Sequence, residues 1–251
     1  MIVKLISLNI WQGGNLWDQV IPFLREEDSD ILLMQEVYDG KDESFERKYR
    51  TFSEVKKSLS LPYAAFAPAF LDTRTIGNID RGNAIFSKFP LTFNEAIAYD
   101  MPYGPYDEEH DNRYEILPMT LQHAMVLINS VSYHLYNLQG IWGTHGGDSQ
   151  RRLKMSEKII TEVKDKEHVI LAGDFNLNPG TETIKNIEKY MHNVFKDELQ
   201  TTFNMAQKKN PNLAKSVVDM VFVSNDIKVL ERSVPQVNIS DHLPLVCTLE
   251  I

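Results

Sequence analysis

The stretch HVILAGDFN, residues 168–176, carries the clearest structural signal in this 251-residue chain. Its apolar run from Val169 to Ala172 is short and stops at a glycine, which is the pattern of a buried strand. Asp174 and Asn176 follow where the strand is expected to end. This placement predicts a strand that carries polar, reactive side chains at its end.

Other extended segments share this arrangement of an apolar run with polar residues at or near one end. They are IVKLISLNI (2–10) with Asn9 before the loop signal Gly13-Gly14, ILLMQEV (31–37) with Glu36, SVVDMVFVS (216–224) with Asp219, and LPLVCTLEI (243–251), which follows Ser240-Asp241-His242. Such clustering is hard to explain by packing alone, although a single solvated carboxylate beside a turn is ordinary.

Helical spacing of apolar residues predicts a helix over residues 16–24, despite Pro22, and a second over residues 45–55. Thr181 can cap a further short helix. The chain therefore opens as strand, helix, strand.

A longer helix is expected after residue 149, where Asp148 or Ser149 can accept hydrogen bonds from its first turn. Its Leu153, Ile160 and Val163 are expected to face inward. This helix leads into the buried strand at residues 168–176.

The middle of the chain predicts short strands and one long loop. Extended segments at residues 63–70 and 83–86 flank a polar loop, and three closely spaced strand-like runs end in SYHLYNLQGIW, residues 132–142. Residues 101–115, MPYGPYDEEHDNRYE, combine proline, glycine, aromatic residues and acids. A loop of this length is typical of the rim of a functional site.

Composition excludes a disordered or fibrous chain, since 43% of residues are hydrophobic and 24% are charged. The length suits one substantial core, and no repeat, linker or low-complexity segment marks a boundary. We therefore expect one domain over residues 1–251.

The sequence shows no sign of a membrane span or a signal peptide. No apolar run approaches the ~20 residues that a spanning helix needs, and the N-terminus lacks a basic start and a cleavage site. Cys247, the only cysteine, cannot form an internal disulfide and lies in an apolar run, which indicates a core residue. These features favour a cytoplasmic protein, although a processed secreted form would show the same features. We also expect a monomer.

The formal net charge of -9 and the pI of 5.3 argue against a protein that grips a long nucleic-acid backbone, which needs a basic stripe. The basic pairs Lys56-Lys57, Arg151-Arg152 and Lys208-Lys209 are scattered and are first interpreted as solvated faces. A local positive groove remains compatible with this composition.

The polar strand ends fit metal-assisted phosphoester chemistry. Glu36 and a nearby aspartate offer hard oxygen ligands of the kind that Mg²⁺ or Mn²⁺ prefers. Asn9 and Asn176 offer neutral amides that hold a phosphate oxygen or a water without repelling it. Asp174 can orient and deprotonate an attacking water.

His242 follows Asp241 and can be approached by Asp219, a pairing that fixes a tautomer and favours the protonated ring. A protonated His242 is a suitable phosphate clamp. The alternative is that Asp219 pairs with a lysine and His242 caps a turn.

Taken in order, these motifs resemble the endonuclease/exonuclease/phosphatase superfamily over nearly the whole chain. The matching motifs are SLNIW with Asn9, LLMQEV with Glu36, GNAIFSKFPL, LAGDFNLNP with Asp174 and Asn176, VVDMVFVS with Asp219, and ISDHLPL with Asp241 and His242. The resemblance implies an α/β (α+β) four-layer sandwich, in which two mostly antiparallel β-sheets pack face to face between helices, with the site at one edge.

The resemblance also implies roles for these residues. Glu36 would be the principal metal ligand, with Asn9 and Asp241 near the metal. Asp174 would act on the attacking water and Asn176 on the phosphate. His242, oriented by Asp219, would contact the phosphoryl oxygens.

Gln139, in YNLQGIWGTH, departs from the family, because similar members carry a histidine at this place. A neutral amide stabilises charge there only by a hydrogen bond, and a positioned acid or base is typically worth ~10²- to 10⁴-fold. His145 is close enough to substitute, but Gln139 is the better match by analogy.

Several further residues are candidates for substrate binding. Aromatic side chains can stack on a base or pack on an apolar group, although most aromatic residues belong to cores, and two arginines can anchor a second phosphate, although solvated charges are commoner. The candidates are Trp11, Tyr103, Tyr106, Trp142, Arg81, Arg113, His145 and, within GNAIFSKFPL, Asn83.

The leading hypothesis is a metal-dependent phosphodiesterase or phosphatase that acts on a phosphate ester such as a small molecule, a nucleotide or a nucleic-acid end. A DNA-repair nuclease is the second, and it predicts salt-sensitive DNA binding. The third is a weakened phosphoester-binding protein, because of Gln139.

Overall fold

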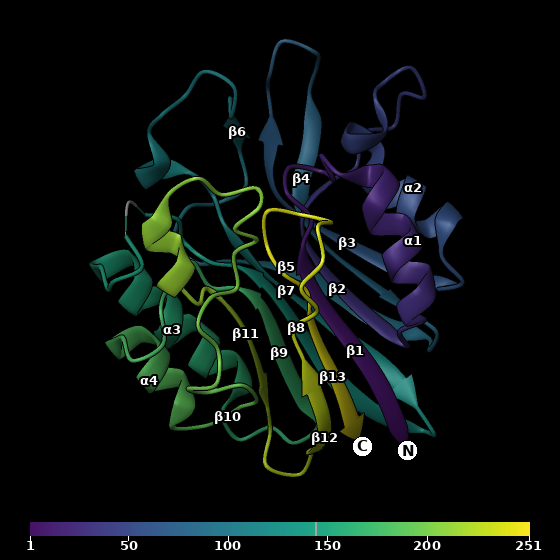
Figure 1. The fold of residues 1–251 in the computed structure, drawn as a ribbon, viewed down its shortest axis with the longest axis vertical. Helices are drawn as coiled ribbons and strands as arrows, with labels where there is room; N and C mark the ends of the chain where they lie inside the picture. The colour runs from purple at the N-terminus through teal and green to yellow at the C-terminus, as the bar shows by residue number, and fades with distance from the viewer. Residues whose placement is uncertain (144) are drawn as a thin grey trace.

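The computed structural model describes residues 1–143 and 145–251, which fold into two β-sheets packed face to face with helices on both outer sides (Figure 1). The first sheet has the order β12-β13-β1-β2-β4-β3-β6 and the second the order β10-β11-β9-β8-β7-β5. Most neighbouring strands are antiparallel, and the parallel pairs are β1 with β2, β3 with β6, and β8 with β9. The four-layer sandwich expected from the resemblance is confirmed.

The strands are β1 (Ile2–Asn9), β2 (Ile31–Tyr38), β3 (Tyr63–Asp72), β4 (Ile79–Ser87), β5 (Leu91–Ala98), β6 (Pro105–Tyr106), β7 (Thr120–Ile128), β8 (Val131–Gln139), β9 (Val169–Asp174), β10 (His192–Asn193), β11 (Asp219–Val223), β12 (Lys228–Ser233) and β13 (Leu245–Glu250). The helices are α1 (Trp17–Glu27), α2 (Thr51–Ser58), α3 (Gln150–Val163) and α4 (Glu182–Glu188), with 3₁₀ turns η1 (Arg47–Arg50), η2 (Tyr114–Ile116) and η3 (Pro211–Lys215). Within the described ranges no helix is long and apolar enough to cross a bilayer.

Side-chain alternation in the strands builds the layers. In β1, Leu5 is buried between the two sheets, whereas the next residue, Ile6, packs with α1 on the outer side. Successive side chains of a strand point to opposite faces, so one strand serves two cores. Cys247 is buried between the sheets, as expected for a core residue.

The buried face of α3 differs from the sequence prediction. Met155, Ile159 and Val163 are its buried apolar residues, whereas Leu153 and Ile160 are only half-buried. The observed residues follow helical spacing of three or four, and Ser149 sets the start of this helix because its hydroxyl accepts the N–H of Arg152.

Asp148, the other capping candidate, belongs to α4 instead. Its carboxylate accepts the N–H groups of Glu182 (2.8 Å) and Thr183 (2.9 Å). Thr181 caps α4 as predicted, since its hydroxyl accepts the N–H of Ile184. The negative charge of Asp148 also suits the positive, N-terminal end of α4.

Three segments correct the expectations for the middle of the chain. The three runs expected before residue 142 are two strands, β7 and β8, because Asn129 and Ser130 adopt positive φ and form a tight hairpin. The helix expected over residues 45–55 begins later, as η1 followed by α2. The extended segment at residues 83–86 is part of the longer β4.

The topology brings the polar strand ends together. Asn9 ends β1 and pairs with Gln35 of β2, and Gln139 ends β8 and pairs with Asp174 of β9. Parallel neighbours end at the same edge of a sheet, and Asp219 of β11 also pairs with Asp174. One edge of the sandwich therefore collects residues from both sheets.

Candidate active site

A cavity of about 450 Å³ opens at this edge. Glu36, Asp174 and Asn176, Asp241 and His242 line it, together with Gln139. The structure thus brings together residues that are far apart in the sequence, and the rim loop predicted at residues 101–115 contributes Glu108 and Tyr114.

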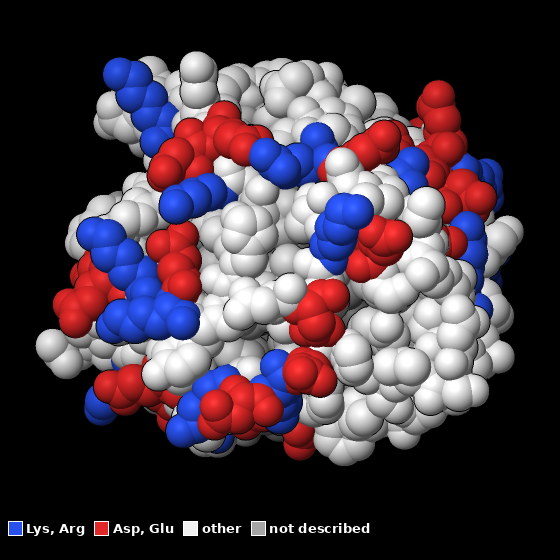
Figure 2. Space-filling view, turned by 90° about the horizontal axis from the view of Figure 1, so that it is seen from below, with Lys and Arg blue, Asp and Glu red and all other residues white. Residues whose placement is uncertain are grey.

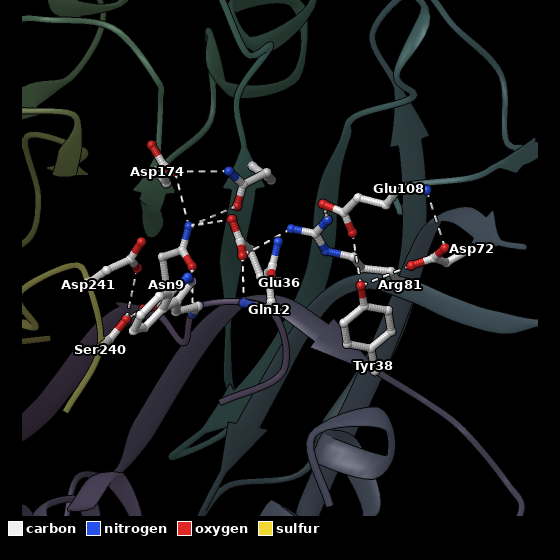
Figure 3. A network of polar contacts seen from close by, with 12 residues as sticks. Asn9, Gln12, Glu36, Tyr38, Asp72, Arg81, Glu108, Asp174, Ser240 and Asp241 are labelled. Carbon is white, nitrogen blue, oxygen red and sulfur yellow. Dashed lines mark hydrogen bonds and ion pairs between the residues drawn. The ribbon is translucent and has the colours of Figure 1, made fainter. Parts of the chain in front are cut away.

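Asn9 lies at the centre of the polar contacts (Figure 3). Its Nδ2 donates to Glu36 Oε1 (3.1 Å) and to Asp174 Oδ2 (3.1 Å), and it lies 3.5 Å from Gln139 Oε1. Its Oδ1 accepts the N–H of Trp11 (3.0 Å), and Ser240 Oγ donates to its backbone oxygen (2.7 Å). Asn9 therefore ties the first sheet to the second and fixes the spacing of two carboxylates.

Glu36 sits at a break in the pairing of β2 with β4 and has a positive φ of 61°. Such a conformation is uncommon for a residue with a side chain and marks a functional position more often than a packing one. Its Oε2 accepts the N–H of Gln12 (2.7 Å) and pairs with Arg81 (3.0 Å). Burial alone would raise the pKa of Glu36, but Arg81 and the hydrogen bonds from Gln12 and Asn9 hold it below its usual value.

Asp174 is buried and has hydrogen bonds on both carboxylate oxygens. Oδ1 accepts the N–H of Asn176 (2.8 Å), and Oδ2 accepts Gln139 Nε2 (2.9 Å) as well as Asn9. Burial, reinforced by the negative charges of Asp219 and Glu36 and opposed by His242, raises the pKa of Asp174 to about 7. A carboxylate with such a pKa can accept and release a proton near neutrality.

Asn176 follows in a left-handed conformation, with φ of 55°, which asparagine tolerates better than most residues. Its Nδ2 donates to the backbone oxygen of Gly140 (3.1 Å), and the residue lines the cavity. The turn after β9 therefore presents an oriented amide.

His242 is buried against Asp219, with 2.8 Å between Nδ1 and Oδ2. Burial opposes the charge, but Asp219 beside it, with Asp174 and Asp241 nearby, raises the pKa of His242 to about 10. The ring also packs on Phe203, with 4.8 Å between ring centroids. The alternative in which Asp219 pairs with a lysine is therefore wrong, and the imidazolium is available to an anion in the cavity.

Asp241 pairs with Lys208 (2.6 Å), a contact that the sequence did not predict. Lys208-Lys209 had the pattern of a solvated face, and Lys208 in fact lines the cavity. The only sequence signal was the basic pair itself, because the contact depends on the path of the loop that precedes η3.

Arg81 lines the cavity but already meets two carboxylates, those of Glu36 and Glu108. The Tyr38 hydroxyl accepts a hydrogen bond from Arg74 (2.6 Å). It lies within donating distance of Asp72 Oδ2 (3.0 Å) and of Glu108 Oε2 (2.9 Å). Figure 3 shows Arg81 and Glu108 beside Glu36, with Tyr38 and Asp72 farther from it. Arg81 was one of two candidate anchors for a second phosphate, and that role stays a prediction. Its guanidinium is paired with both carboxylates and holds Glu36 in place.

The other substrate-binding candidates divide into two groups. Trp11, Trp142 and His145 line the cavity, and the Trp142 ring lies 4.2 Å from that of Tyr114. The remaining candidates do not line the cavity. Asn83 Nδ2 donates to the backbone oxygens of Thr120 and Asn137 between the sheets, and Tyr106 is buried in the core. Arg113 pairs with Asp111, and Tyr103 donates to Asp80. For Tyr103, Tyr106 and Arg113, a position in the rim loop did not reveal the direction of the side chain.

The donor set fits a divalent cation. Five carboxylates surround three basic groups, with Glu36, Glu108, Asp174, Asp219 and Asp241 against Arg81, Lys208 and His242. The oxygens of Asp174 and Asp219 and a nitrogen of His242 lie within 4.8 Å of one another. Because a metal needs a neutral imidazole and His242 is held protonated, Glu36 with Asn9 and Asp241 is the better set for a hard cation.

The surface charge offers no continuous basic track on the face seen from below. There, lysine and arginine are interspersed with aspartate and glutamate (Figure 2). This distribution agrees with the scattered basic pairs in the sequence.

Comparison with known proteins places these observations in a family. The sequence profile of the Endonuclease/Exonuclease/phosphatase family matches residues 6–242. No curated protein gives a significant sequence match.

Solved structures of low sequence identity share the fold. An endonuclease/exonuclease/phosphatase from Beutenbergia cavernae gives a TM-score of 0.77 at 15% identity, covering 100% of this chain and 72% of that one. The mannosyl-6-phosphatase of Bacteroides thetaiotaomicron gives 0.71 at 17%, covering 99% and 100%. The human Nocturnin catalytic domain with bound sulfate gives 0.70 at 15%, covering 99% and 94%.

Proposed function

This chain belongs to the Endonuclease/Exonuclease/phosphatase family, and we propose that it hydrolyses a phosphoester bond with the help of a divalent cation. The observation that carries the proposal is the contact of one amide, Asn9 Nδ2, with both Glu36 and Asp174. That contact sets a low-pKa carboxylate beside one whose pKa lies near neutrality. A metal ligand and a proton acceptor require these two different properties.

In this proposal Glu36 holds the cation, with Asn9 and Asp241 beside it. The cation, Mg²⁺ or Mn²⁺, supplies positive charge to a phosphate oxygen. Asp174 orients a water and takes its proton at a carboxylate oxygen. His242, protonated and held by Asp219, donates to a phosphoryl oxygen, and Asn176 and Gln139 donate amide N–H groups.

The substrate in this proposal is a small or end-accessible phosphate ester. The cavity, at about 450 Å³, lies in the range typical of small-ligand sites. Trp142 and Tyr114 offer an aromatic surface at its wall. A sugar phosphate is one such ester, and a structural neighbour is named a mannosyl-6-phosphatase. We also propose a cytoplasmic location, which the single buried cysteine fits, and a monomeric state.

The test is a hydrolysis screen with Mg²⁺ and with Mn²⁺ over nucleic acids, nucleotides, lipid headgroups, sugar phosphates and inositol phosphates. Glu36→Ala should abolish metal-dependent turnover, and Glu43→Ala, which changes an exposed glutamate, should not. Full activity in Glu36→Ala, or in the presence of a chelator, would refute the metal mechanism. Hydrolysis confined to duplex DNA and lost steeply with salt would favour the repair nuclease.

A second candidate, a weakened phosphoester-binding homologue, is favoured by Gln139. Its amide donates to Asp174 at 2.9 Å, where a histidine would bring a group able to carry charge. Gln139→His should raise kcat by ~10²-fold or more if the chain is an impaired enzyme. Phosphoester binding without turnover in either form would instead identify a binder.

A further inference from the structure

Three positively charged side chains line the active-site cavity, and they are neutralised to different degrees. The Arg81 side chain is 6% exposed and meets two carboxylates, and the His242 side chain is 7% exposed and faces Asp219. The Lys208 ammonium contacts a single carboxylate among the described residues, that of Asp241, and its side chain is 31% exposed. Lys208 is therefore the cation of this cavity whose charge can most readily turn to a ligand.

The chain before Lys208 is fixed to the turn that carries Asp241. Asn204 is buried, its N–H donates to the backbone oxygen of Asp241 (2.9 Å), and its Nδ2 donates to the backbone oxygen of Ser240 (2.8 Å). The backbone oxygen of Asn204 in turn accepts the N–H of Lys208 (3.0 Å). These contacts hold the backbone of Lys208 beside the turn, so the position of the ammonium depends on the flexible four-carbon stem.

Phe203 relates this ammonium to His242. The Phe203 ring lies 4.8 Å from the His242 ring, measured between centroids, and Lys208 Nζ lies 5.4 Å from the Phe203 centroid. All three side chains line the same cavity. The ammonium and the imidazolium therefore border the same part of the cavity, next to Asp241.

We propose that Lys208 is a substrate-binding residue whose ammonium contacts an anionic oxygen of the phosphate group that is cleaved. The inference rests on the proposed function, in which Asp241 lies beside the divalent cation and His242 donates to the same phosphate. The contact with Asp241, at 2.6 Å, already holds the ammonium at this part of the cavity. An ammonium suits a phosphate because it presents a compact charge and three donors.

Asp241 serves Lys208 in the metal-free protein and a cation in the metal-bound protein. In the metal-bound protein Asp241 attracts the ammonium less, because the cation takes up part of its negative charge and also repels the ammonium. Rotation of the exposed stem then lets Lys208 exchange the carboxylate oxygen for a phosphate oxygen. Figure 3 shows Asp241 and Arg81 on opposite sides of Glu36, so the two cations approach the expected metal ligands from different directions.

Inorganic phosphate binding in saturating Mg²⁺, measured by calorimetry, tests the contact without turnover. Lys208→Met should weaken phosphate binding ~10- to 100-fold, which is the range expected for one hydrogen bond to a charged group. Lys208→Arg keeps the charge and should retain most of the affinity. Lys209→Met is the matched control, because it removes the same charge from an adjacent, exposed residue that does not line the cavity.

Mg²⁺ binding without phosphate should change in the opposite direction. Lys208→Met removes the ammonium that shares the Asp241 carboxylate, so the affinity for Mg²⁺ should rise several-fold, whereas Lys209→Met should leave it unchanged. A purely structural role would not raise one affinity and lower the other. A fall in Mg²⁺ affinity in Lys208→Met would show that Lys208 only supports the Asp241 turn, and would overturn the proposal.

Hydrolysis separates this proposal from the proposed function. On the best substrate of the screen, Lys208→Met should raise KM by a similar factor and change kcat much less, because the contact is present before and during the reaction. A wild type that binds phosphate through Lys208 but hydrolyses nothing would refute the proposed function and leave the binding role. Equal phosphate affinities in Lys208→Met and Lys209→Met, with melting temperatures that show folded proteins, would overturn the binding role and leave hydrolysis standing. A wild type that binds no phosphate in Mg²⁺ would overturn the binding role as well.

Discussion

Two histidines in this molecule have opposite electrostatic surroundings. His242, at the active-site edge, faces the carboxylate of Asp219 at 2.8 Å, and its pKa rises to about 10. His134, on the outer face of the second sheet, faces the imidazole of His123 at 2.9 Å, and its pKa falls to about 4. Burial lowers the pKa of both rings and is the largest cause at His134; the neighbouring imidazole adds to this effect, whereas the carboxylate of Asp219 overcomes it at His242.

The difference shows how one residue type is assigned two kinds of chemistry. A carboxylate neighbour offsets the cost of burying an imidazolium, which then offers protons to an anion. An imidazole neighbour adds a like charge when both are protonated, so the pair stays neutral and its two rings share a hydrogen bond. The first suits an anion such as phosphate, and the second offers it no charge.

The largest contrast is expected in catalysis. His242→Gln should lower kcat by ~10²- to 10⁴-fold, because it removes the protonated group that faces the cavity. His134→Gln should leave kcat unchanged. Steady-state kinetics on the best substrate of the screen compares the two variants, and equal losses in both would show that the comparison has no functional meaning.

Asp219→Asn should remove the carboxylate that raises the pKa of His242. Removing one partner of a buried pair typically costs ~3–5 kcal/mol of unfolding free energy, and the pKa of His242 should fall towards or below 6.5. A raised folded-state pKa stabilises fully below the unfolded value of 6.5 and less as pH rises through about 10. Metal-free wild type should therefore lose stability from pH 7 to 10 in urea unfolding, and the loss should be smaller in Asp219→Asn.

The stability of the protein at acidic pH tests the surroundings of His134. The lowered pKa of His134 means that the folded state gains no proton there until about pH 4, whereas the unfolded chain does so near 6.5. The stabilising contribution of the neutral pair is therefore lost as pH falls from 6.5 to 4. His134→Gln should lose less stability than the wild type over this window, by on the order of 1 kcal/mol, because solvent screens this half-buried group. Parallel losses in the two proteins would contradict the neutral pair.

The smallest effect is expected from Lys166→Met. Lys166 lowers the pKa of both His123 and His134 through its positive charge. Its removal should raise both pKa values only slightly, since the charge is partly solvated. Imidazole titration by NMR measures this, and a fall in either value would reverse the sign of the argument.

The sequence predicted a large part of the site but not its pairings. Asn9, Glu36, Asp174 and His242 were singled out because each stands at or beside an apolar strand. The last three line one cavity, and Asn9 contacts Glu36 and Asp174 there. The contact of Lys208 with Asp241 was missed, because it depends on a loop path. The catalytic roles themselves stay predictions.

The buried face of α3 and the pairing of Arg81 show the same limit of sequence-based prediction. The start of α3 was predicted, but Met155 rather than Leu153 faces inward, because the side of a helix that is buried depends on what it packs against. Arg81 was a candidate anchor for a second phosphate, and its pairing with Glu108 from the rim loop was not predicted. Residues 27 positions apart give no local pattern from which such a pairing can be predicted.

Local sequence determined where the strands run and which polar residues stand at their ends, because apolar periodicity and turn residues act over a few positions. Tertiary structure decided which side chains share a proton or a charge. Asp174 has a pKa near neutrality, His242 is cationic and His134 is neutral only because burial and particular neighbours across the sheets change the free energy of the charged form.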